Sequence, residues 1–148
     1  MQLSSTAYGF RFHHLGLAVP APDQAFKFLE AIGYTVGAQT FDPLQNVNLA
    51  MRHHASMPAV EVIWPGDGPS PIDQMIKRGN MIYHMCFETD DADASIAAME
   101  ADGLRVFSLG GPKPARLFGG IPVSFHRIDG VGLIEFIHGR PRPPETSL

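Results

Sequence analysis

The sequence predicts an α+β fold in which two βαβββ modules pair to form one curved mixed sheet around a metal cleft. The first observation is an internal repeat: the segments that begin at His14 and His84 align without a gap, and four identical residues recur at a constant offset of 70. The second is that each half places one acidic residue, Glu61 or Glu135, in an otherwise apolar strand. The third is the hydrophobic pattern, which alternates between strand and helix periods in the same order in both halves.

The first module is expected to span residues 9–66 and to contain a strand, a helix and three further strands. Alternation predicts a strand over residues 10–19 that ends at two prolines, and Asp23 is placed to cap the helix that follows. Apolar residues at helical spacing predict that helix over residues 24–31, and Gly33 is well placed to end it. The remaining strands are predicted at 35–39, 47–53 and 59–64.

A linker rich in proline and glycine, with a short helix, is expected over residues 67–79. The second module, residues 80–138, repeats the order of the first. Its first strand is predicted at 81–88, and a run of aspartates is placed to cap a helix over residues 94–101. The remaining segments are strands at 105–109, 122–127 and 132–137, a mobile loop at 110–120, and a proline-rich tail over 139–148 that is expected to be disordered or to lie along the surface.

Composition restricts the classes of function. A chain of 148 residues suits one compact domain, or two tightly fused half-domains that share one core. The formal net charge of −4 gives no basic surface for nucleic acid. No apolar stretch approaches the ~20 residues of a membrane span, and the start of the chain has no signal-peptide pattern. The one cysteine, Cys86, excludes an internal disulfide and fits a reducing compartment. We therefore expect a cytoplasmic protein that binds neither nucleic acid nor a membrane.

The repeated histidines and glutamates predict a metal site. Alternation places His14, rather than His13, on the inner face of the first strand. Glu61 and Glu135 are the only charged residues in their strands, and a carboxylate inside an apolar sheet is costly unless a cation compensates it. Two imidazoles and two carboxylates, without a thiolate, suit a divalent ion such as Zn, Ni, Co, Mn or Fe(II). Such an ion acts as a Lewis acid on a carbonyl oxygen and stabilises the enolate formed by proton loss at the adjacent carbon.

Each of these residues has a simpler explanation when it is taken alone. A single histidine in a strand is more commonly a hydrogen-bonded core or surface residue than a ligand, and a single glutamate commonly lies on a solvated face. Four such residues at matched positions of a duplicated unit favour the metal. Cys86 is expected to be a small core residue. The other histidines are expected at the surface or behind the ligands, and they are His13, His53, His54, His126 and His138.

These motifs resemble those of the vicinal oxygen chelate superfamily, which includes glyoxalases, bleomycin resistance proteins and dioxygenases. The stretches that carry the resemblance lie between about residues 10 and 138, and they are Phe12–Val19, Val60–Pro65, Ser70–Ile72, Tyr83–Asp91 and Gly132–Ile137. The second-half motif, Tyr83–Asp91, is the most specific. The resemblance is closest to methylmalonyl-CoA epimerase-like and glyoxalase-like members. It implies paired βαβββ modules around a divalent metal, whose ligands fall on His14, Glu61, His84 and Glu135.

The chain departs from the epimerase pattern at two positions. Similar epimerases usually have Gln at the position of Glu61, and they place a catalytic Glu on the preceding strand, where this chain has Asn48. An epimerase needs two bases on opposite faces of the carbon acid, and Asn48 is expected to donate a hydrogen bond to the substrate instead. The ligand set looks more like that of glyoxalase I, in which a metal-bound glutamate also moves the proton. Glyoxalase I typically has an Arg four residues after the first ligand, where this chain has Ala18.

The resemblance implies a metal-dependent isomerase or epimerase of the methylmalonyl-CoA epimerase type, which removes a proton next to a metal-bound carbonyl or thioester. Glu61 or Glu135 would act as both ligand and base, and Lys113 and Arg116 would either meet the CoA-like tail or face solvent. A lactoylglutathione lyase (glyoxalase I)-like lyase is the alternative. An Fe(II) dioxygenase, which the fourth protein ligand disfavours, and a non-catalytic small-molecule-binding protein are further alternatives. A homodimer is expected, with the cleft closed within one chain or between two.

Overall fold

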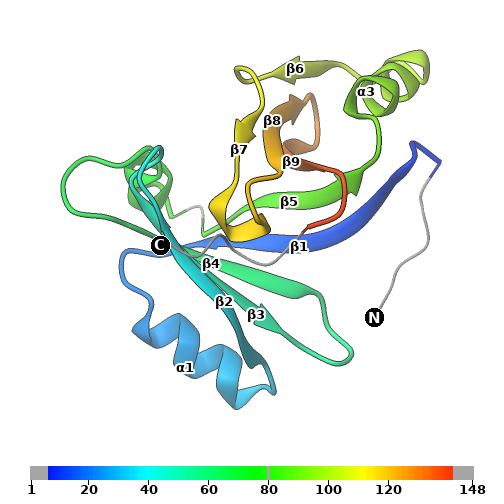
Figure 1. Ribbon diagram of the computed structural model, residues 1–148. Coiled ribbons are helices and arrows are strands. Elements are labelled where there is room, and N and C mark those ends of the chain that lie inside the picture. The colour runs from blue at the N-terminus through cyan, green and yellow to red at the C-terminus, as the bar shows by residue number, and fades with distance from the viewer. Residues whose placement is uncertain (1–6, 80, 142–148) are drawn as a thin grey trace.

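The computed structural model describes residues 7–79 and 81–141, which form one curved nine-stranded mixed sheet with helices packed against it (Figure 1). The strand order is β2-β3-β4-β1-β5-β9-β8-β6, and β7 pairs with β8. The first module contains β1 (Phe10–Ala18), α1 (Asp23–Ala31), β2 (Thr35–Asp42), β3 (Val47–His53) and β4 (Ala59–Pro65), followed by α2 (Asp73–Lys77). The second contains β5 (Ile82–Thr89), α3 (Ala92–Ala101), β6 (Val106–Ser108), β7 (Lys113–Pro114), the 3₁₀ helix η1 (Arg116–Phe118), β8 (Pro122–Ile128) and β9 (Gly132–His138).

The two modules join through their first strands. β1 and β5 pair antiparallel, and each also pairs in parallel with the last strand of its own module, which is β4 or β9. The four central strands therefore follow the order β4-β1-β5-β9. These four strands carry the four predicted metal ligands, so the duplication brings the ligands together within one chain.

The predicted fold is confirmed, and the boundaries of most elements differ from the expected ones by only a few residues. Asp23 does not cap α1: it is the first residue of the helix, and Pro22 occupies the N-cap position without a side-chain hydrogen bond. Asp91 caps α3 as expected, because its carboxylate accepts a 3.0 Å hydrogen bond from the N–H of Ala94. The expected loop at 110–120 contains β7 and η1. Most of the predicted tail, from residue 142 onward, lies outside the described residues.

Apolar side chains fill both faces of the sheet. α1 covers a cluster that includes Leu29 and Val62, and α3 covers another that includes Met99 and Phe136. Full burial of a side chain such as Phe136 stabilises the fold by about 1.5–3 kcal/mol. A third cluster lies on the opposite face, beside the predicted ligands, and contains Met51, Cys86, Leu117, Phe118, Ile121, Val123 and Ile137. Among the described residues, no helix is long and apolar enough to cross a membrane.

Candidate metal centre

The four predicted ligands meet in one buried cluster. His14 comes from β1, Glu61 from β4, His84 from β5 and Glu135 from β9, and each residue is 5% exposed or less. Nε2 of His14 lies 3.2 Å from Nε2 of His84. The same atom of His14 lies 3.6 Å from Oε1 of Glu61 and 3.5 Å from Oε1 of Glu135. Nε2 of His84 lies 3.8 and 3.2 Å from those two oxygens.

These separations suit four ligands of one divalent ion. Ligands at about 2.0–2.2 Å from a tetrahedral Zn²⁺ are about 3.4 Å apart, and all four donor atoms here lie within 4.8 Å of one another. Buried polar atoms almost always have a hydrogen-bond partner. Among the described residues, however, Oε1 of Glu135 is buried without one. A cation between the two imidazoles and the two carboxylates would satisfy this oxygen, so the residues present fit a metal ion.

Opposite charges stabilise the cluster when no metal is bound. Burial on its own would lower the pKa of His14, but the neighbouring carboxylates of Glu61 and Glu135 outweigh it and raise this pKa to about 9. Burial would likewise raise the pKa of Glu135, but the imidazoles of His14 and His84, whose Nε2 atoms lie 3.5 and 3.2 Å from its Oε1, hold it well below its usual range. A metal ligand must be a neutral imidazole, so a proton and a metal ion compete for His14.

A glycine makes room for the ring of His84. The pairing of β1 with β5 places Gly16 directly opposite His84. A Cβ added at Gly16 would lie 2.8 Å from Nε2 of His84 and closer still to two other atoms of the ring. The close approach of this imidazole, rather than an unusual backbone conformation, is therefore what requires glycine at this position.

A small cavity opens onto the carboxylates and adjoins a larger pocket. The small cavity has a volume of about 30 Å³, and its lining includes Glu61, Glu135 and Asp42. The larger pocket has a volume of about 310 Å³ and is mostly apolar, with Lys113 in its lining. The two spaces adjoin because they share five lining residues, which are Gln45, Ile72, Tyr83, Val123 and Phe125. Tyr83 therefore lies where the pocket meets the metal ligands, a place that its sequence position did not indicate.

The other predicted site residues lie farther from the ligands. Alternate residues of a strand face opposite ways, so Asn48 faces away from the small cavity, which Val47 and Leu49 of β3 line. The amide of Asn48 donates a 3.4 Å hydrogen bond to the carbonyl of Pro65. The structure thus does not bring Asn48 to the metal ligands. Lys113 lines the larger pocket, whereas Arg116, in η1, lines neither of the two spaces.

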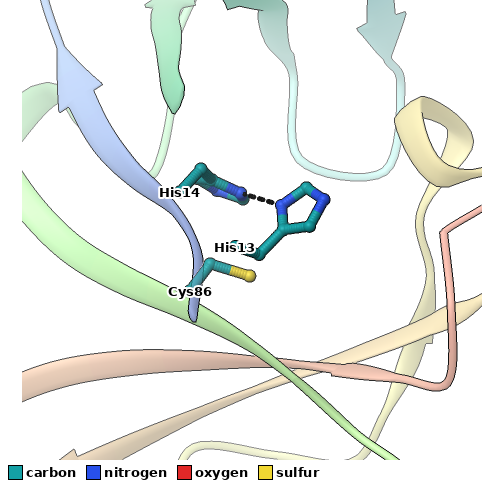
Figure 2. A group of neighbouring side chains, drawn as sticks. All are labelled: His13, His14 and Cys86. Atoms are coloured by element: carbon teal, nitrogen blue, oxygen red, sulfur yellow. Dashed lines mark hydrogen bonds between the residues drawn. The ribbon is translucent and has the colours of Figure 1, made fainter. Parts of the chain in front are cut away.

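His13 lies directly behind His14, one of the predicted ligands. The pairing of β1 with β5 shifts register between Phe12 and His14, and this irregularity lets two consecutive histidines meet. Nδ1 of His13 lies 2.8 Å from Nδ1 of His14 (Figure 2). Burial and the neighbouring His14 lower the pKa of His13 to about 4, so His13 is neutral and can accept the proton on Nδ1 of His14. This hydrogen bond selects the form of His14 in which Nε2 is free to bind a metal.

Cys86 lies beside these two rings, as Figure 2 shows. Donor atoms of His13, His14 and Cys86 lie within 4.8 Å of one another. The 2.8 Å separation of the two histidine nitrogens fits a shared proton better than two ligands of one ion, which are more than about 3 Å apart. Burial raises the pKa of the Cys86 thiol well above its usual value, so the sulfur is neutral. This trio therefore packs behind the cluster of proposed ligands.

Asp42 is a carboxylate in the cavity that the sequence did not single out. It is the last residue of β2, it is 5% exposed, and it lines the same small cavity as Glu61 and Glu135. Its Oδ1 accepts a 2.9 Å hydrogen bond from the N–H of Leu44. In the sequence, Asp42 precedes a proline at the end of a strand, which indicates a turn and nothing more.

Comparison with known sequences identifies a family. The sequence model of the Glyoxalase/Bleomycin resistance protein/Dioxygenase superfamily matches residues 13–125. A relative, the ethylmalonyl-CoA/methylmalonyl-CoA epimerase of Cereibacter sphaeroides, is 28% identical over 108 residues, which cover 70% of this chain and 78% of that protein.

Solved structures with the same fold include further epimerases. Methylmalonyl-CoA epimerase from Mycobacterium tuberculosis has a TM-score of 0.70 at 20% identity, covering 97% of this chain and 94% of its own. The Streptomyces coelicolor enzyme in complex with 2-nitronate-propionyl-CoA has a TM-score of 0.64 at 23% identity, covering 85% and 94%. A hypothetical protein from Bacillus halodurans C-125 has a TM-score of 0.73 at 20% identity, covering 93% and 99%. These likenesses show the fold. Because the matching sequence model spans more than half of the chain, the chain belongs to the Glyoxalase/Bleomycin resistance protein/Dioxygenase superfamily.

Proposed function

We propose that the protein is a divalent-metal-dependent isomerase that moves the proton on the carbon next to the thioester carbonyl of an acyl-CoA. The observation that carries this proposal is the buried cluster of two imidazoles and two carboxylates at the inner end of a pocket. The relative and two of the solved structures described above are epimerases of malonyl-type CoA thioesters, which supports the same class of reaction.

His14 and His84 would hold the ion through Nε2, and Glu61 and Glu135 would hold it through their carboxylates. A bound divalent ion supplies a Lewis acid that stabilises negative charge on the thioester oxygen when the neighbouring carbon loses its proton. A carboxylate has two oxygens, so Glu135 can keep one toward the ion and take up the substrate proton with the other. The carbon acid would lie in the small cavity that these carboxylates line.

The spaces around the ligands favour a short acyl group on a long tail. The cavity next to Glu61 and Glu135 has a volume of only about 30 Å³, which admits a group of a few atoms. The adjoining pocket of about 310 Å³ offers an apolar wall to the thiol-bearing arm of CoA. Lys113 lines this pocket, where its ammonium group would meet a phosphate or carboxylate of the substrate.

A proton-exchange assay tests the proposal. The metal-loaded protein is incubated with methylmalonyl-CoA in heavy water, and deuterium at the carbon next to the thioester is measured by mass spectrometry. We expect exchange with the metal-loaded protein and its loss after chelation or in His84→Ala. Absence of exchange with Zn, Co, Ni, Mn and Fe(II) alike would contradict the proposal and favour a non-catalytic binding protein.

A glyoxalase I-like lyase is the second candidate, because the carboxylate of Glu61 completes a His, Glu, His, Glu set. We place this candidate second because Ala18 is fully buried and cannot hold the carboxylate of a glutathione adduct. The same preparations are assayed with the hemithioacetal of methylglyoxal and glutathione, and faster turnover there than with methylmalonyl-CoA would reverse the order. The homodimer and the cytoplasmic location expected from the sequence stay predictions, the first of which light scattering tests.

A further inference from the structure

We infer that Asp42 is the second acid–base residue of this site, facing Glu135 across the cavity. The inference rests on the proposed function. Inversion at the carbon next to a carbonyl needs one group that removes a proton from one face and another that delivers a proton to the opposite face. Asn48, which occupies the expected position on β3, has no acid–base chemistry and faces away from the cavity.

The sheet places Asp42 and Glu135 on different walls of one small cavity. Asp42 ends β2, which is the edge strand of the first module, and Glu135 lies on β9. Four strands separate β2 from β9 in the sheet, in the order β3, β4, β1 and β5. Both side chains nevertheless line the same cavity of about 30 Å³, because the sheet curves around it. We place the two carboxylates on opposite sides of a carbon held in that cavity, because they come from strands that are far apart in the sheet.

The surroundings of Asp42 are those of a functional carboxylate. The residue is only 5% exposed, and its Oδ1 accepts a 2.9 Å hydrogen bond from the N–H of Leu44. Within residues 7–79 and 81–141, no lysine or arginine forms an ion pair with it. Burial of a carboxylate without a cation is unfavourable. The turn after β2 does not explain this burial, because a neutral Asn or Ser can accept the same backbone hydrogen bond.

The proposed step balances as a proton relay. With one substrate epimer, ionised Glu135 takes the proton from the carbon, and the electron pair of the broken C–H bond becomes part of the enolate. Protonated Asp42 then donates its proton to the opposite face of the same carbon, which forms the other epimer. Glu135 ends protonated and Asp42 ionised, and exchange of protons with water restores the starting state. With the other epimer, the same steps run in reverse.

Asp42→Asn tests this role, because it keeps the acceptor for the N–H of Leu44 and removes the acid–base group. Asp73→Asn is the matched control: Asp73 also accepts a backbone hydrogen bond, from the N–H of Ser70 at 2.9 Å, and it does not line the small cavity. Each variant is loaded with metal and incubated in heavy water with each separated epimer of methylmalonyl-CoA. Inversion and deuterium incorporation are measured separately, beside metal stoichiometry and circular dichroism.

We expect Asp42→Asn to lose inversion by at least about 100-fold, the lower end of the range for general acid–base catalysis. It should retain deuterium exchange with one epimer, because Glu135 still removes the proton from one face. Inversion at the rate of wild type or of Asp73→Asn would overturn the inference, and so would equal loss of exchange with both epimers. Absence of exchange in the metal-loaded wild type would overturn the proposed function itself. Where Asp42→Asn folds poorly, Asp42→Ser gives the same comparison.

Discussion

Gly16→Ala should displace the ring of His84 from the proposed metal centre, although the substitution replaces none of the four proposed ligands. The added Cβ would lie 2.8 Å from Nε2 of His84, whereas ordinary contacts of a Cβ begin at 3.4 Å. The ring must therefore move by roughly 0.6 Å or more, and metal–ligand distances tolerate only about 0.2 Å. Substitution of a residue that only hydrogen-bonds to a metal ligand weakens metal binding by about 10–100-fold. Displacement of a ligand itself should therefore weaken it by at least about 100-fold.

This loss of affinity has a measurable thermal consequence. A 100-fold weaker Kd removes about 2.7 kcal/mol of the stabilisation that a fixed excess of metal provides. For a chain of this size, 1 kcal/mol corresponds to about 2–4 °C in Tm. The rise in Tm caused by Zn²⁺ or Co²⁺ should therefore be smaller in Gly16→Ala than in wild type by about 5–11 °C.

The assay is differential scanning calorimetry of both proteins with and without metal. Because the rise in Tm is taken within each protein, any effect of the methyl group on the metal-free fold cancels. Gly111→Ala serves as the control, since a Cβ at Gly111 meets no atom within 4 Å and its backbone is not in the left-handed region. Equal metal-induced rises in Gly16→Ala and wild type would refute the assignment of His84 as a ligand beside Gly16.

Three further predictions concern the neighbours of the centre. His13→Leu should weaken metal binding by about 10–100-fold, measured by competition with a chelator. His13→Asn keeps a hydrogen-bond acceptor near Nδ1 of His14 and should restore most of the lost affinity. Equal affinity in wild type and both variants would contradict the role of the hydrogen bond to His14. In the metal-free protein, the raised pKa of His14 contributes stability below pH about 6.5 that is lost toward pH 9, and the lowered pKa of Glu135 contributes stability above pH about 4.5 that is lost in acid. The free energy of unfolding, measured with urea, should therefore be highest between about pH 4.5 and pH 6.5. A maximum near pH 9 would contradict this prediction. Lys113→Ala should raise KM for an acyl-CoA several-fold with little change in kcat, and an unchanged KM would place the tail elsewhere.

The meeting of the four proposed ligands was predictable because the duplication repeats a strand together with its inward residue. His14 and His84 occupy equivalent positions of β1 and β5, and the pairing of those strands across the module boundary is what makes them meet. Glu61 and Glu135 stood out as single charges in apolar strands, and both are buried. Alternation and an internal repeat were sufficient for this part of the site, because both act within one strand.

The residues that sequence reasoning missed depend on relations between strands. Asp42 reaches the cavity only because a curved sheet folds its edge strand toward β9. His13 meets His14 because β1 has a register shift, which strict alternation cannot predict. Asn48 shows the converse: it lies on β3 as expected, but the alternate residues Val47 and Leu49 line the cavity. Curvature and register are three-dimensional quantities without a simple pattern in the chain.

Metal stoichiometry tests the central claim most directly. Wild type and a Glu61→Ala, His84→Ala double variant are incubated with Co²⁺, dialysed and subjected to elemental analysis. We predict about one divalent ion per wild-type chain and loss of that ion in the double variant. Equal metal content in the two proteins, or no metal in wild type with any of Zn, Co, Ni, Mn and Fe(II), would contradict it.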